Sequence, residues 1–230
     1  MTDPVELEST QQTDDPVEVA AAYAEAGADE LFLAAGGVPH DALTELVGRI
    51  ANFISIPVLV AAEFSNAQSF AGLVDAGASR VVVGAPALRD PNFITSLART
   101  FGSGGVVVSI QSLSQDEGWR VAAGPDGAPT EWDAVTWARV VEAQGGGELL
   151  VSSSTHPQEG PFDLDLLRAV SSEVDIPVLA AGEAEAMEDL FDALMIGGAE
   201  GVLVGSLLHS GRATVGAVKS FLAEHGLGDN

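Results

Sequence analysis

The chain has 230 residues, of which 47% are hydrophobic and only 6% aromatic, so small aliphatic side chains must fill its interior. Its 34 acidic and 9 basic residues give a formal net charge of −25, which repels nucleic acid and anionic membranes. The absence of cysteine excludes disulfides and thiolate sites, and the apolar runs are too short to span a membrane. The N-terminus lacks the pattern of a signal peptide, so we expect a cytoplasmic, soluble protein with one domain over residues 1–230.

Short apolar segments alternate along the chain with segments of helical periodicity, which is typical of repeated βαβ units. Asp15-Pro16 and Asp90-Pro91 predict helix starts, with an aspartate cap and proline at the first helical position. Gly27 and Gly77 stand where helices should end. We expect strands at residues 30–35, 56–62, 80–84, 105–111, 148–152, 176–181 and 201–205. Residues 5–9, where apolar and acidic side chains alternate, are expected to supply an eighth strand.

Two parts of the sequence, about half the chain apart, resemble each other. Residues 56–59 recur as residues 176–179, and residues 27–31 are echoed by residues 145–149. Two fused (βα)4 halves would produce such repeats, so the sequence predicts an α/β fold of the (βα)8 TIM-barrel type. Residues 118–128 predict a small hairpin inserted after the fifth strand. Three tryptophans flank this hairpin and are expected to pack it onto the barrel: Trp119, Trp132 and Trp137.

Several motifs occur in an order that is found in one known family. They lie at residues 15–18, 27–31, 101–103, 106–108, 147–150, 163–170, 176–178 and 208–209. From about residue 12 to the C-terminus, the chain resembles the cyclase subunit of imidazole glycerol phosphate synthase. The resemblance implies a (βα)8 barrel of histidine-biosynthesis ancestry, with an atypical or truncated first strand.

The catalytic groups that the resemblance implies are replaced in this chain. In the family, two aspartates at the carboxyl ends of opposite strands act as general acid and base. One would lie on a first strand upstream of this chain, and the other falls on Gln111, whose amide cannot exchange a proton at neutral pH. Another aspartate falls on Ala35, and the strand ends at Ser152 and Ala181 are also without a carboxylate. We therefore expect no catalytic residue at these positions, and no metal or cofactor.

The phosphate-binding motifs are altered as well. The family binds a substrate with a phosphate at each end through glycine turns and helix N-termini. Two paired glycines of the family correspond to Ala62-Glu63 and Gly182-Glu183, where a carboxylate would oppose the anion, and another motif corresponds to Gly84-Ala85. Gly205-Ser206 keeps the form of an anion-binding turn. A small anionic ligand, if one binds, is expected there.

Charged residues also match a motif that the family carries at the opposite end of the barrel, where the strands begin. Glu30, Arg80 and Glu148 correspond to three members of a ring that, in the family, gates ammonia arriving from a glutaminase partner. The simpler alternative is that these charges plug the barrel floor and stabilise it, since features of this face usually serve stability. The resemblance thus implies a glutaminase-like partner, with a second copy of the chain as the alternative.

Other polar residues offer chemistry that has a simpler interpretation. Residues 152–156 place serines near a histidine, but no carboxylate is positioned to orient that histidine, which favours a polar loop. Glu63 and Glu183 are related by the internal repeat and are either solvated rim residues or a paired site for a cation. The four histidines lack metal-ligand spacing: His40, His156, His209 and His225.

Three functions compete at this point. The chain is a barrel that has lost cyclase activity and serves as a binding or partner subunit, a barrel enzyme with new chemistry at the same mouth, or a working cyclase. Gln111, Ala35, Glu63 and Glu183 together disfavour the working cyclase, because they affect both proton transfer and phosphate binding. The sequence does not separate the first two functions.

The acidic surface, with Lys219 as its only lysine, predicts a halophilic protein whose stability rises with salt. Screening should relieve repulsion within a chain of charge −25 more than it weakens exposed ion pairs. The melting temperature, followed by circular dichroism, is expected to increase from dilute buffer to molar sodium chloride. A flat or falling profile would contradict the halophilic interpretation.

Overall fold

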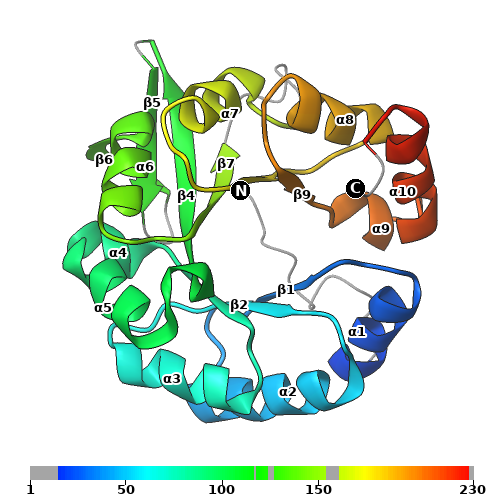
Figure 1. The fold of residues 1–230 in the computed structure, drawn as a ribbon, viewed down its shortest axis with the longest axis horizontal. Helices are drawn as coiled ribbons and strands as arrows, with labels where there is room; N and C mark the ends of the chain where they lie inside the picture. The colour runs from blue at the N-terminus through cyan, green and yellow to red at the C-terminus, as the bar shows by residue number, and fades with distance from the viewer. Residues whose placement is uncertain (1–14, 117, 124–126, 154–160, 228–230) are drawn as a thin grey trace.

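The computed structural model describes residues 15–116, 118–123, 127–153 and 161–227. Within these ranges, seven parallel strands form one sheet in the order β1, β2, β3, β4, β7, β8, β9. Figure 1 shows these strands around a common centre with the helices outside, as in a (βα)8 barrel. The strands are β1 (Leu31–Ala34), β2 (Val58–Ala61), β3 (Arg80–Val83), β4 (Val106–Gln115), β7 (Glu148–Ser153), β8 (Val178–Ala181) and β9 (Gly201–Leu203).

The helices follow the strands in alternation and cover the outer face of the sheet (Figure 1). They are α1 (Pro16–Glu25), α2 (His40–Phe53), α3 (Ala67–Ala76), α4 (Ala85–Arg89), α5 (Asn92–Phe101), η1 (Ser103–Gly105), α6 (Ala134–Ala143), α7 (Leu164–Ser171), α8 (Met187–Met195), α9 (Ser206–His209) and α10 (Val215–Glu224). In the described ranges, no helix combines the length and the apolar character needed to cross a membrane.

The predicted helix boundaries are partly confirmed. Asp15 caps α1, where its carboxylate accepts the N–H of Val17 at 3.0 Å, and Gly77 ends α3 with a positive φ of 121°. The second predicted start was wrong by one residue, because Pro91 lies in a turn and α5 begins at Asn92. Asp90 still caps this turn by accepting the N–H of Asn92 at 3.0 Å.

The predicted hairpin is confirmed as part of an antiparallel extension of β4. Strand β5 (Gly118–Ala123) pairs with the end of β4, and β6 (Ala128–Asp133) pairs with β5. Trp119 donates its indole N–H to the Asp163 carboxylate at 2.6 Å, and Asp163 also caps α7. Trp132 contacts the fully buried Trp137 with ring centroids 5.0 Å apart. The tryptophans thus fasten the hairpin to the barrel.

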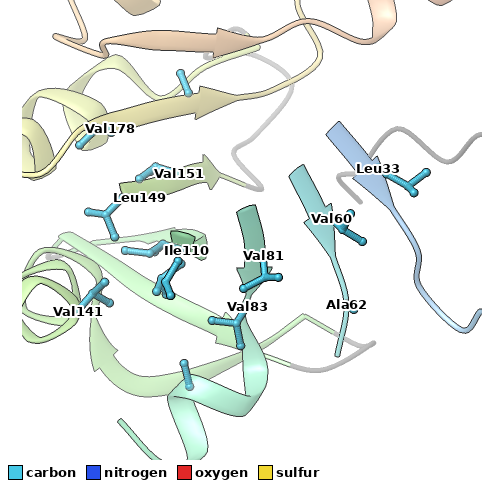
Figure 2. Packing of buried hydrophobic residues seen from close by; sticks show 14 of the residues in the cluster. Leu33, Val60, Ala62, Val81, Val83, Ile110, Val141, Leu149, Val151 and Val178 are labelled. Atoms are coloured by element: carbon cyan, nitrogen blue, oxygen red, sulfur yellow. The ribbon is translucent and has the colours of Figure 1, made fainter. Parts of the chain in front are cut away.

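Side chains are buried on both faces of the sheet, because successive residues of a strand point to opposite sides. The larger cluster lies between strands and helices, and Figure 2 shows Leu33, Val60 and Val81 among its members. The smaller cluster consists of alternate strand residues and fills the barrel interior, with these at its centre: Leu59, Val82, Val107 and Leu150. The aliphatic composition therefore suits a parallel barrel.

Strands β1 and β9 are the two ends of the described sheet, and two long-range contacts lie near this seam. The Tyr23 hydroxyl on α1 is 2.9 Å from Nδ1 of His209 on α9. The Lys219 ammonium on α10 lies 2.5 Å from the Asp29 carboxylate before β1. The predicted eighth strand, residues 5–9, lies outside the described residues.

The burial of His209 beside Tyr23 predicts a pH-dependent stability. Burial lowers the pKa of His209 below its ordinary value of 6.5, so the folded chain binds this proton less readily than the unfolded chain. The stabilisation that comes from burying His209 in its neutral form should be complete above pH 6.5 and should be lost as the pH falls toward the lowered pKa. We expect urea unfolding between pH 8 and pH 5 to show a smaller pH dependence for His209→Gln than for the unmodified chain. His225→Gln, away from the seam contact, is the matched control, and equal profiles for all three proteins would contradict the assignment.

Candidate functional site

The carboxyl ends of the parallel strands form the mouth of the barrel, where (βα)8 proteins place their functional groups. Hydrogen-bonded register puts Gln111 opposite Ser152, Ser152 opposite Ala181, and Ala181 opposite Leu203. Three of the predicted degenerate positions therefore form one continuous row across β4, β7 and β8. The fourth, Ala35, is 7% exposed and packs in the outer cluster between sheet and helices.

The row at the mouth carries amide, hydroxyl and methyl groups. Gln111 and Ser152 are both partly buried, and the fully buried Ser112 donates its hydroxyl to the Ser152 carbonyl at 3.3 Å. None of these side chains exchanges a proton near neutral pH. The row can therefore donate and accept hydrogen bonds, but it cannot act as a general acid or base.

The two rim carboxylates, Glu63 and Glu183, follow β2 and β8 and are both exposed. Neither forms an ion pair with a described residue. Their exposure fits the interpretation of solvated rim residues. Among the described residues, no group of three or more His, Cys, Asp or Glu side chains is arranged to hold a metal ion.

One of the predicted ligand-binding positions, Gly182, has a structural role. A Cβ atom at Gly182 would lie 2.3 Å from the Pro161 carbonyl oxygen and 2.9 Å from the Phe162 ring, so only glycine fits there. Gly84 precedes the short helix α4, and Ala85 is the first residue of that helix. The close packing at Gly182 explains this glycine without a ligand.

The predicted anion turn at Gly205-Ser206 is joined to the loop after β8. The Ser206 hydroxyl donates to the Ala184 carbonyl at 2.7 Å, so its proton is already used. An anion at this turn would depend on the free backbone N–H groups that begin a helix such as α9. Arg212, which reaches the Glu185 carbonyl at 3.4 Å, is an exposed cation nearby that the sequence analysis missed. Its only sequence signal is a basic residue shortly after the last mouth turn.

The three residues predicted at the barrel floor contact one another. The Arg80 guanidinium binds the carboxylates of both Glu30 and Glu148. Glu148 is only 8% exposed, and this burial raises its pKa; Arg80 opposes the rise, while Glu30 and Glu200 add to it. Glu200 is a further acidic member that the sequence analysis missed. It directly precedes β9, as Glu30 directly precedes β1, and Glu148 is the first residue of β7.

Comparisons with known proteins agree with this architecture. A family model described as histidine biosynthesis protein matches residues 1–214, so the similarity begins earlier than the expected residue 12. Imidazole glycerol phosphate synthase subunit HisF of Myxococcus xanthus is 38% identical over 227 residues, covering 97% of this chain and 90% of the relative. The HisF subunit of a Synechocystis species is also 38% identical, over 220 residues covering 92% and 84% of the two chains.

Fold and strand-end geometry define an α/β protein of the (βα)8-barrel class. The chain belongs to the histidine biosynthesis protein family, and its curated relatives place it with the HisF subunits of imidazole glycerol phosphate synthase.

The position of Glu183 predicts how the Gly205-Ser206 turn responds to substitution. Glu183→Gly should strengthen phosphate binding several-fold, because removing a like charge at an exposed rim is worth about 1 kcal/mol. Isothermal titration calorimetry with inorganic phosphate checks this, with Glu183→Gln as an isosteric variant and Glu63→Gly as the control at the other turn. Tight binding by the unmodified chain, or no gain from either Glu183 variant, would show that the carboxylate does not oppose this turn.

Proposed function

We propose that the chain is a diverged HisF-like barrel that has lost cyclase activity and serves as a binding or partner subunit. The observation that carries the proposal is the row formed by Gln111, Ser152 and Ala181 at the mouth. General acid–base catalysis needs side chains that gain and lose a proton near the operating pH. This row supplies none, although its place in the barrel corresponds to the site of chemistry in the family.

The rim charges support the same proposal. Glu63 and Glu183 stand beside the two turns where the family would bind phosphate groups, and the net charge of −25 adds long-range repulsion. A doubly phosphorylated substrate would therefore meet negative charge at both ends of the mouth. Loss of proton transfer and loss of phosphate binding are independent defects for cyclase chemistry, and both favour a non-cyclase role over a working cyclase.

Cyclase activity with ammonia as nitrogen donor should be absent from the unmodified chain. Gln111→Asp alone should not restore it, because no second carboxylate stands in the same row and both rim glutamates remain. The measurement is turnover of the ribulosyl-phosphate substrate by the purified protein, with a curated HisF relative as positive control. Measurable turnover would support a working cyclase and overturn the proposal. A mass-spectrometric screen for co-purified ligands separates a binding role from new chemistry.

The floor of the barrel, the face at which the strands begin, favours a partner role. Because α2 and α8 each end just before a strand begins, their C-terminal residues lie at the face that holds the floor charges. Three of the exposed large hydrophobic side chains are found there: Phe53 (74%), Met195 (55%) and Ile196 (44%). Exposed apolar groups around a charged centre are typical of protein–protein contact surfaces. We infer that this face binds a glutaminase-like subunit.

The partner role predicts a complex that depends on this face. Mixing the chain with a purified glutaminase subunit of imidazole glycerol phosphate synthase should give a one-to-one complex in size-exclusion chromatography with light scattering. Phe53→Ser should weaken the complex about tenfold or more, as truncating a buried apolar anchor does in other interfaces. Val38→Ser, an exposed apolar residue that follows β1 at the mouth, is the matched control. A self-dimer that Phe53→Ser disrupts would instead indicate a second copy as partner.

A further inference from the structure

A cavity of about 440 Å³ lies between helix α4 and the hairpin. Helix α4 contributes Leu88 and Arg89 to its lining, and the hairpin contributes Thr130, Glu131 and Trp132. This volume lies within the range of about 300–1,000 Å³ that is usual for small-molecule sites. Ala85, one of the predicted ligand-binding positions, also lines the cavity, whereas Gln111, Ser152, Ala181 and the two turns with glutamates do not.

The hairpin wall of this cavity is held in place by several contacts. The Thr130 hydroxyl donates to the Val121 carbonyl at 2.8 Å and accepts the N–H of Trp132 at 3.2 Å. Trp132 packs against the fully buried Trp137. The indole of Trp132 is therefore fixed before any ligand arrives, which reduces the entropy lost on binding.

Two opposite charges line the cavity without neutralising each other. Arg89 and Glu131 are both exposed, and neither forms an ion pair within the described part of the chain. The backbone carbonyl of Glu131 accepts from the Arg120 guanidinium at 2.9 Å, which anchors this edge of the hairpin. The Glu131 carboxylate thus remains available to a ligand cation, and the Arg89 guanidinium to a ligand carboxylate.

We propose that this cavity binds an aromatic α-amino acid in its zwitterionic form. Arg89 binds the ligand carboxylate, Glu131 binds the ligand ammonium group, and the ligand ring packs on Trp132 and Leu88. The whole-chain charge favours this class over organic anions, because a zwitterion has no net charge for the acidic surface to repel. The proposal does not depend on the loss of cyclase activity.

Isothermal titration calorimetry with L-phenylalanine tests the proposal on the full chain. L-Phenylalanine should bind, whereas 3-phenylpropanoate, which lacks the ammonium group, and phenethylamine, which lacks the carboxylate, should each bind at least about tenfold more weakly. Arg89→Gln and Glu131→Gln should each weaken binding of L-phenylalanine by about the same factor, since each leaves one ligand charge unpaired.

Matched controls are the exposed Arg99→Gln on α5 and Glu18→Gln on α1, which remove the same charges away from the cavity and should leave the affinity unchanged. Circular dichroism confirms that every variant is folded. The proposal is overturned if L-phenylalanine does not bind, if 3-phenylpropanoate binds equally well, or if the Arg89 and Glu131 variants behave like their controls.

Discussion

The parallel hydrogen-bond register from β1 to β9 decides which side chains meet in this protein. Since the seven strands of the barrel path, β1 to β4 and β7 to β9, all run in one direction, each of them begins at the floor and ends at the mouth. A change of register by one residue would turn each inward side chain toward the helices. The contact of Arg80 with Glu30 and Glu148 and the row of Gln111, Ser152 and Ala181 are two consequences of the same register.

Charge is distributed differently at the two ends of this barrel. At the floor, the buried Glu148 and the exposed Glu30 share the guanidinium of Arg80, and salt screens the buried Glu148–Arg80 contact less than it screens an exposed pair. At the mouth, Glu63 and Glu183 are exposed and have no basic partner among the described residues, so their charges face solvent. The floor charges therefore bind one another, while the proposed exclusion of anions depends on the exposed rim charges.

Features that depend on local pattern could be predicted from the sequence. The seven strand positions follow from apolar runs such as residues 80–84 and 176–181, and the hairpin follows from its flanking turn residues. The floor contact could be predicted because charges directly before buried strands have to share the barrel end. The register that places Gln111 beside Ser152 supports the expectation that this row lacks carboxylates.

Features that depend on distant packing could not be predicted in this way. The Ser206 hydroxyl is taken by Ala184, and Gly182 is required by Pro161 and Phe162, although both residues suggested ligand contacts in the sequence. The cavity beside Arg89 forms only because a hairpin that is 29 or more residues further along the chain folds back over α4. No local motif encodes such a juxtaposition, since it arises from the ladder that joins β5 to β4.

The seam between β1 and β9 links the acidic composition to barrel closure. Lys219, the only lysine, is used here to bind Asp29, where the α10 side of the barrel meets the segment that leads into β1. Both partners of this ion pair are partly or fully exposed, so salt weakens it, while the same salt relieves repulsion across the rest of the surface. The Tyr23–His209 hydrogen bond is partly buried and does not depend on a charge, so screening leaves it intact. Of the two contacts near β1 and β9, salt therefore weakens the Lys219–Asp29 ion pair and leaves the Tyr23–His209 hydrogen bond intact.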